Sequence, residues 1–441
     1  MGAVSGEGGD RSRPRTCLPI EALYSGRITS VGAGMLRARL PSAEIGQCVE
    51  IDRSGRPLMA ELVGFSDEEA LLLPLDAVDG LRPGASARAS AVGHVAPCIE
   101  QALGRVIDGL GRCMRTGEQL PSGESLLRAA PPSALGRRPV ERPVPTGLRV
   151  VDGMLPLGEG QRVGLFAGSG VGKSTLLAQL GRGIEADVVV MALVGERGRE
   201  VGEFIEVLEA SGLLDRTTLV VATADASPLL RRRAAEMATA IAEGWRSRGR
   251  HVLLLVDSLT RYARALREAA LLRGEPPARR GYPASVFAEL PRLLERAGQS
   301  EEGAITAIYT VLVDGGDMEE PVADEVRGLV DGHWVLRREL AERGHFPAVD
   351  VPSSVSRVFS RIASSDHREH ASSVRRMLET LSQRREAIEL GLYEYGTHPA
   401  VDAAIDAEEE LLTFLRQGPE EWTDASCTLE RLEALAELSH D

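Results

Sequence analysis

A glycine-rich run that ends in the only lysine of the chain is the strongest chemical signal in the sequence. Every other basic side chain among the 441 residues is arginine or histidine, and this one lysine, Lys173, follows Gly168-Ser-Gly-Val-Gly172. Successive backbone N–H groups of such a loop bind phosphate oxygens, and a compact ammonium on a flexible stem reaches over them. We therefore predict a nucleoside triphosphate site made by Gly168, Ser169, Gly170, Val171, Gly172, Lys173, Ser174 and Thr175.

The surroundings of this loop support the same prediction. An apolar stretch at 162–166 predicts a strand before the loop, and residues 174–180 predict a helix after it. Strand, loop and helix in this order are the context that a phosphate-binding P-loop requires. Ala167 stands where the strict pattern has its first glycine, which is a mild departure. In this arrangement the Ser174 hydroxyl is expected to bind Mg²⁺.

Two carboxylates follow predicted strands and are the candidates for metal binding and catalysis. Asp257 ends the apolar run 251–256, and Glu196 follows the apolar run 187–194. Ligands bind at the carboxyl ends of parallel strands, so Asp257 is predicted to orient Mg²⁺ and Glu196 to orient the attacking water. A structural alternative exists for each: Asp257 as the cap of a following helix, and Glu196 as the partner of a nearby arginine.

The composition limits the class of protein. The formal net charge is −14 and the sequence pI is about 5.3, which argues against general nucleic-acid binding. No apolar run approaches 18 residues, and the N-terminus has no signal-peptide pattern, so we expect neither a membrane span nor export by a signal peptide. The five cysteines are scattered, which favours free thiols.

Changes in pattern along the chain predict four segments. Residues 1–25 are rich in Gly, Ser, Arg and Pro and predict a disordered tail, and short apolar runs with turn signals at 26–95 predict a small β-barrel. Residues 96–365 alternate strands and helices, with apolar strands also at 218–222 and 305–313, which predicts an α/β domain with a buried parallel sheet. Helical spacing of apolar residues, such as Val374, Met377 and Leu381, predicts a helical domain at 366–441. The proline-rich segment 121–145 is expected to be a connector.

Several motifs together resemble the α and β subunits of rotary ATPases. They are Ala102–Arg112, the P-loop, Gly195–Val201 and Asp257–Ala263. The segments 274–287 and 321–327 resemble the protein-export branch, which comprises the type III secretion (injectisome) ATPases and the flagellar export ATPase. The stretches 262–267 and 289–296 look more like the injectisome form.

This resemblance implies a fold and a set of roles. The fold is an N-terminal β-barrel, a RecA-like P-loop core and a helical C-terminal domain, and the substrate is ATP with Mg²⁺. Lys173 and Ser174 hold phosphate and metal, Glu196 is the catalytic carboxylate, and Arg197 lies beside the phosphates. Arg357, which the chain's own pattern leaves as a surface charge, matches an arginine finger that reaches into a neighbouring subunit. Phe346 matches a position that is usually tyrosine and packs on adenine.

The resemblance also implies partners and a location. It predicts a homohexamer at the inner face of the cytoplasmic membrane that binds a central stalk, peripheral stator proteins, the export gate and chaperone–effector complexes. The presence of both Glu196 and Arg357 in one chain allows identical copies to build every site of a ring. The alternatives are a flagellar export ATPase, a hexameric nucleic-acid translocase and a non-catalytic assembly subunit. The second would need more aromatic residues in the barrel than Tyr24 and Phe65.

Overall fold

The computed structural model describes residues 25–32, 34–40, 43–53, 57–90 and 94–438. The chain divides into two compact units, Met1–Ala91 and Val92–Asp441. The disordered tail predicted for residues 1–25 lies outside the described residues except for Ser25. Among the helices of the described part, none is both long and apolar enough to cross a membrane.

The first unit is the predicted β-barrel. Its strands close in the order β1-β2-β5-β4-β3-β6, with antiparallel pairing throughout. Alternate residues point inward, so Leu36 and Ala38 of one strand are fully buried while their neighbours are exposed. The strands are β1 (Ser25–Val31), β2 (Leu36–Arg39), β3 (Cys48–Ile51), β4 (Leu58–Ser66), β5 (Glu69–Pro74) and β6 (Ser86–Ser90).

The second unit is built on a parallel sheet with the order β16-β10-β15-β13-β11-β12-β8, to which β17 and β14 add antiparallel pairs. All five predicted strands are present, and β8 and β16 are additional. The strands are β8 (Val106–Asp108), β10 (Arg162–Ala167), β11 (Val188–Glu196), β12 (Thr217–Thr223), β13 (His251–Asp257), β14 (Gly298–Gln299), β15 (Ala304–Leu312), β16 (Gly332–Leu336) and β17 (Val355–Ser356).

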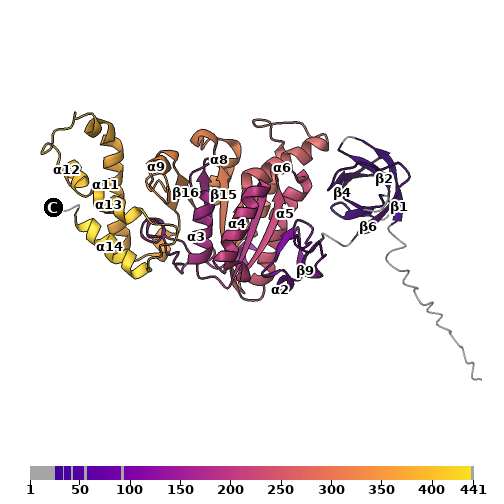
Figure 1. Cartoon of the computed structure of the whole chain (residues 1–441), viewed down its shortest axis with the longest axis horizontal. Coiled ribbons are helices and arrows are strands. Elements are labelled where there is room, and N and C mark those ends of the chain that lie inside the picture. Colours follow the sequence, from indigo (N-terminus) through magenta and orange to yellow (C-terminus); the bar gives the residue numbers. More distant parts are fainter. Residues whose placement is uncertain (1–24, 33, 41–42, 54–56, 91–93, 439–441) are drawn as a thin grey trace, which may run out of the picture. The chain divides into compact units, whose positions relative to one another are not determined.

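Helices cover both faces of this sheet, which explains why its strands are almost continuously apolar (Figure 1). Val189 and Met191 of β11 pack in the same cluster as the P-loop helix, whereas Val190 and Ala192 pack with the helices of the opposite face. One face carries α3 (Lys173–Gly183) and α4 (Gly198–Ala210), and the other carries α5 (Pro228–Arg246), α6 (Leu259–Leu272), α7 (Ala284–Leu294) and α8 (Pro321–Leu329).

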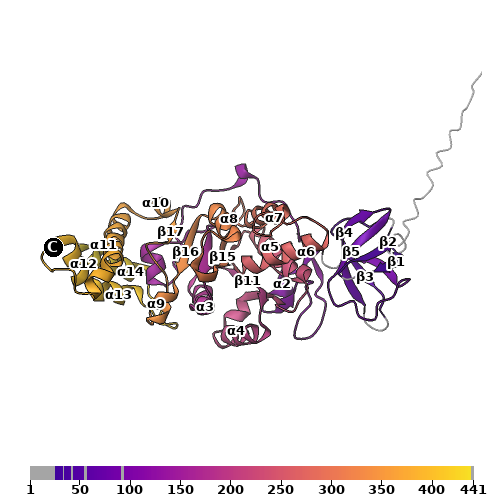
Figure 2. The ribbon, with the colours of Figure 1, turned by 90° about the horizontal axis from the view of Figure 1, so that it is seen from above.

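The proline-rich segment begins as a strand and continues as the expected connector. Residues Ser122–Leu126 form β9, which pairs with β7 (Val95–Pro97). Figure 2 shows the remainder running along the side of the body that carries α7 and α8. Its Arg137 donates a hydrogen bond to the Ala297 carbonyl (3.0 Å) just after α7. The segment therefore straps the α/β core.

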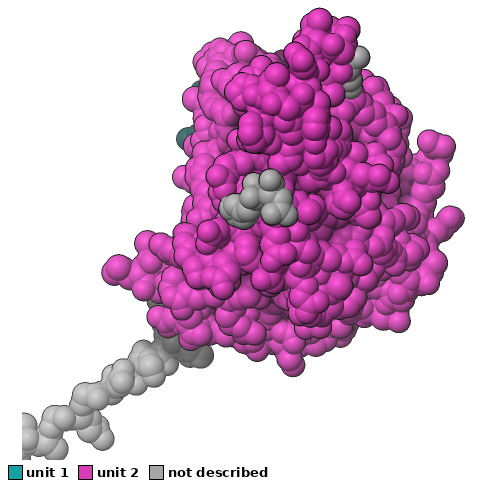
Figure 3. Space-filling view, turned by 90° about the vertical axis from the view of Figure 1, so that its left-hand side faces the viewer, with its two compact units in different colours: residues 1–91 teal, residues 92–441 magenta. Residues whose placement is uncertain are grey.

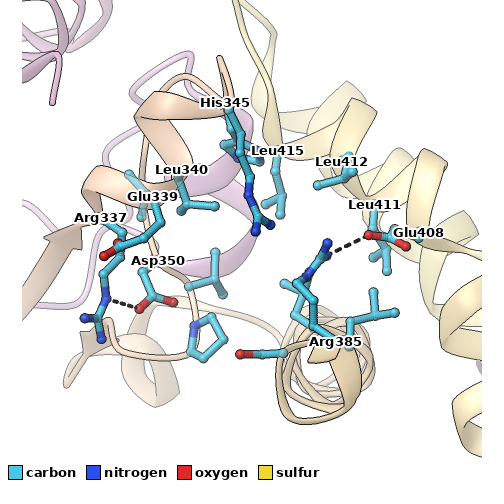
Figure 4. A pocket seen from close by; sticks show the side chains of 17 residues that line it. Arg337, Glu339, Leu340, His345, Asp350, Arg385, Glu408, Leu411, Leu412 and Leu415 are labelled. Carbon is cyan, nitrogen blue, oxygen red and sulfur yellow. Dashed lines mark hydrogen bonds and ion pairs between the residues drawn. The ribbon is translucent and has the colours of Figure 1, made fainter. Parts of the chain in front are cut away.

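The predicted helical domain forms one end of the second unit (Figure 1), and this end of the unit faces the viewer in Figure 3. Its helices are α11 (Ser365–Glu389), α12 (Pro399–Asp406), α13 (Glu408–Leu415) and α14 (Ala425–Glu437). A cavity of about 420 Å³ lies where α11 and α13 meet α9 (Arg338–Glu342). Figure 4 shows that leucines and two ion pairs, Arg385–Glu408 and Arg337–Asp350, line it.

Candidate active site

The glycine-rich loop joins the end of β10 to the start of α3, as the sequence predicts. Gly170 (φ 78°) and Gly172 (φ 86°) have left-handed backbone conformations that other residues rarely adopt. Lys173 is the first residue of the helix. Left-handed residues within a tight loop turn successive N–H groups toward one point at a helix N-terminus, which is a binding site for phosphate.

The Lys173 ammonium lies between two carboxylates. Its Nζ atom is 2.5 Å from Asp257 Oδ1 and 3.6 Å from Glu196 Oε1. The register of β11 and β13 pairs Leu193 with Asp257, so both acids reach the carboxyl edge of the sheet beside the P-loop. The predicted lysine and both predicted acids therefore come together.

The surroundings of Asp257 fit a magnesium site. The side chain is buried and accepts a hydrogen bond from the Thr310 hydroxyl (2.7 Å). The N-cap of α6 is Ser258, so the alternative role of Asp257 as the cap of the following helix does not apply. The Ser174 hydroxyl belongs to the exposed first turn of α3. One carboxylate and one hydroxyl are a donor set that Mg²⁺ uses together with substrate phosphates.

Glu196 has an oxygen available for a water molecule. Its side chain is 13% exposed, and Oε1 is buried and makes no hydrogen bond to the described residues. Burial and the nearby Asp257 carboxylate raise its pKa, against the opposing effect of Lys173. Its close cationic partner is this lysine, whereas Arg197 pairs with Glu200 (3.4 Å) and is exposed.

Phe346 lies beside the phosphate loop with an open ring face. A Cβ atom built on Gly172 would be 3.3 Å from the Phe346 ring, and 43% of the residue is exposed. The Phe346 carbonyl accepts a hydrogen bond from the Gln417 N–H (2.8 Å). An exposed aromatic face next to bound phosphates can stack on a nucleotide base.

Arg357 lies at the amino ends of the parallel strands, whereas the other site residues lie at their carboxyl ends. It follows β17, whose Ser356 pairs with Gly332 at the start of β16, and its N–H bonds the Asp331 carbonyl. Its guanidinium donates to the Arg327 carbonyl (3.1 Å). The P-loop follows the carboxyl end of β10, which runs parallel to β16, whereas Arg357 lies beside the amino end of β16. The length of β16, about 13 Å, therefore separates Arg357 from the P-loop.

Sequence reasoning missed two side chains at the site. Thr310 bonds Asp257 from a different strand, and Arg338 donates to the Ser169 carbonyl (3.3 Å). Arg338 also lines a cavity of about 310 Å³ beside the loop. A threonine in an apolar strand and an arginine after one carry no local signal of these contacts.

Comparison with known proteins identifies two segments. Residues 147–356 match the ATP synthase alpha/beta family, nucleotide-binding domain, and residues 363–434 match the T3SS EscN ATPase C-terminal domain. The match to the nucleotide-binding domain contains Lys173, Glu196, Asp257 and Phe346, and it ends one residue before Arg357.

Two relatives and one solved structure are similar to almost the whole chain. The chain is 46% identical over 416 residues to a type 3 secretion system ATPase of Pseudomonas syringae pv. syringae, covering 92% of each chain. It is 45% identical over 412 residues to the flagellum-specific ATP synthase of Bacillus subtilis, covering 92% of this chain and 94% of the relative. The assembled EscN of enteropathogenic E. coli, in complex with its central stalk EscO, superposes with a TM-score of 0.85 at 42% identity, over 93% of this chain and 100% of EscN.

Proposed function

The chain belongs to the family of type 3 secretion system ATPases, which are P-loop enzymes that hydrolyse ATP, and we propose how its residues carry out that reaction. The N–H groups of the loop and Lys173 hold the phosphates of ATP. Ser174 and Asp257 hold Mg²⁺, and Phe346 stacks on the adenine. When bound, Mg²⁺ neutralises negative charge on the phosphate oxygens.

Hydrolysis needs a water molecule aligned with the γ-phosphate, and we assign this task to Glu196. The Oε1 atom accepts no hydrogen bond from the described residues and lies 3.6 Å from Lys173 Nζ, and therefore close to the phosphates that Lys173 would bind, which supports the assignment. Because its pKa is raised, the ionised form of Glu196 is a better proton acceptor than an ordinary glutamate. Arg197, at the start of α4, is assigned to contact the phosphates.

The observation that carries the quaternary proposal is the separation of Arg357 from Lys173. Arg357 lies at the amino ends of the strands and the P-loop at their carboxyl ends, so the two cannot serve the same site within one chain. In a closed head-to-tail ring of identical copies, the surface that carries the P-loop of one copy faces the surface that carries Arg357 of the next copy. We therefore propose a homohexamer with an arginine finger supplied in trans.

We further propose that this ring works on the cytoplasmic side of the inner membrane and couples hydrolysis to chaperone release, unfolding and export of secreted proteins. The central stalk of EscN supports a stalk partner for this chain. Its other proposed partners are stator proteins, an export gate and chaperone–effector complexes. A flagellar role is the alternative, and a pull-down that identifies flagellar or injectisome stalk proteins separates the two.

The catalytic assignment is tested with Glu196→Gln. The amide keeps the shape but cannot accept a proton, so we expect ATP binding to persist while phosphate release falls by about 10² or more. Glu203→Gln is the matched control, since Glu203 is an exposed acid of the neighbouring helix α4 that pairs with Arg199 (3.5 Å). If Glu196→Gln hydrolyses ATP as fast as the control, the assignment is wrong.

A further inference from the structure

A buried threonine contacts the proposed metal-binding carboxylate. Thr310 belongs to β15, which lies between the P-loop strand β10 and the Asp257 strand β13. The register pairs Val256 with Tyr309, so Thr310 is next to Asp257 across the sheet. The residue is fully buried and its hydroxyl donates to Asp257 Oδ1 (2.7 Å).

The same oxygen has a second partner that must leave during the reaction. Asp257 Oδ1 is 2.5 Å from Lys173 Nζ, and no other cation makes an ion pair with Asp257 in the described residues. When Lys173 turns to the phosphates of ATP, as the proposed function requires, Asp257 loses this partner. Glu196, the other acid at the site, repels Asp257 and gives it no support.

We propose that Thr310 is a positioning residue that holds Asp257 in its metal-binding orientation after Lys173 has moved to the phosphates. An ionised carboxylate only accepts hydrogen bonds, so the Thr310 hydroxyl is the donor. Thr310 is part of the sheet and cannot follow Lys173 away. This inference rests on the proposed function, because it presumes that Asp257 binds Mg²⁺ and Lys173 binds phosphate.

The strand offers its own control. Thr306 lies four residues earlier on the same face of β15, is equally buried, and bonds the Gly160 N–H and His251 near the opposite edge of the sheet. Thr306→Val removes a buried hydroxyl far from the site. Thr310→Val removes the hydroxyl at the site with almost no change of shape, and Thr310→Ser restores it.

The test measures the affinity of the full chain for a fluorescent ATP analogue, once with Mg²⁺ and once with EDTA. We expect the affinity in EDTA to be the same for all variants. With Mg²⁺, Thr310→Val should bind about tenfold or more weakly than wild type, the range for a lost hydrogen bond to a charged group. Thr310→Ser and Thr306→Val should resemble wild type.

Several outcomes would overturn the inference. They are an unchanged Mg²⁺ effect in Thr310→Val, a loss in Thr310→Ser as large as in Thr310→Val, and an equal loss in Thr306→Val. Where Thr310→Val does not fold, Thr310→Ala, which cannot clash, takes its place in the same comparison. A wild-type chain that does not bind the analogue at all would instead refute the proposed function, so the two failures are distinguishable.

Discussion

At the scale of the residue, the ammonium of Lys173, for which we propose a phosphate-binding role, lies between two acids. Its ammonium is balanced by Asp257 and Glu196, which lie at the ends of neighbouring strands. A point charge on a flexible stem can leave these acids and reach over the loop, whereas a planar guanidinium needs a wider space. This difference gives a reason for the one lysine in a chain that otherwise uses arginine.

The lone lysine gives a simple chemical test. An amine-directed acylating reagent should modify only Lys173 and the N-terminal amine, because no other lysine exists. ATP should protect Lys173 by engaging its ammonium and covering a side chain that is only 13% exposed. Peptide mass spectrometry, with and without ATP, measures both sites, and the N-terminal amine is the internal control. Equal labelling of Lys173 with and without ATP would contradict the phosphate assignment.

The site was predictable from the sequence only where motif and strand order coincide. Lys173, Glu196 and Asp257 each adjoin a predicted strand of a parallel sheet, so their meeting follows from the fold. The roles of Phe346 and Arg357 came from the family resemblance. Thr310 was missed because its partner is 53 residues away on another strand, and register is not visible in the local pattern.

At the scale of the element, one buried arginine ties the helical domain to the α/β core. Arg149 precedes the helical turn Val150–Met154 and is 3% exposed. Its guanidinium donates to the Phe414 carbonyl (2.8 Å) and to the Arg416 carbonyl at the end of α13, and it also pairs with Glu421. These bonds satisfy carbonyls that the end of a helix leaves free.

Arg149→Met should loosen this attachment. Methionine fills the volume but leaves buried carbonyls of α13 without donors, which costs about 2–4 kcal/mol. We expect α13 and α14 to open more easily than the P-loop helix. Amide hydrogen exchange followed by mass spectrometry measures the two regions separately.

The control for this prediction is Arg142→Met. Arg142 is 81% exposed and pairs with Glu159 (3.1 Å), so its loss should change stability by about 1 kcal/mol or less. Unchanged exchange of α13 and α14 in Arg149→Met would show that other contacts hold the domain.

Pattern length explains which elements were predictable. Long apolar strands such as β11 and β15 stand out, and their predicted bounds differ from the observed ones by one or two residues. In contrast, β8 has three residues, and β16 contains glycine and histidine within five residues. Such short strands form because the neighbouring strands supply their partners, which is a tertiary effect.

At the scale of the whole molecule, buried and partly buried histidines make stability depend on pH. Burial lowers the pKa of His345 to about 4 and also lowers the pKa values of His251, His333 and His367. The unfolded chain, with a histidine pKa of about 6.5, takes up protons that the folded chain refuses. The stability that these neutral histidines contribute is therefore fully present above about pH 6.5 and is lost as the pH falls toward 4.

His345→Gln should reduce this acid sensitivity. Between about pH 7 and pH 5, His345 contributes about 1–2 kcal/mol of the loss, and glutamine does not titrate. Urea unfolding at both pH values measures the difference, with the exposed His398→Gln as a control. If wild type and His345→Gln lose the same stability, the imidazole of His345 is not a source of the effect.

The proposed ring leads to the most specific prediction, because each active site is proposed to combine Lys173 of one copy with Arg357 of the next. Lys173→Ala and Arg357→Ala chains should each be inactive, since a finger contributes about 10³–10⁵ in rate. Mixed rings regain sites wherever an Arg357→Ala chain, which keeps Lys173, meets the Arg357 of a Lys173→Ala neighbour. Random mixing in equal amounts restores about one quarter of the sites in a head-to-tail ring.

Phosphate release from equimolar mixtures, with ring formation checked by size-exclusion chromatography, measures this recovery. Arg361→Ala is the control, because this exposed arginine lies four residues from Arg357 and should leave the rate unchanged. A cis finger would need Arg357 to cross the length of β16 to its own P-loop, and mixing would then restore nothing, because each chain would lack one half of its own site. Recovery in the mixture therefore distinguishes a shared site from a site within one chain, and its absence in verified mixed rings would refute the arginine finger in trans.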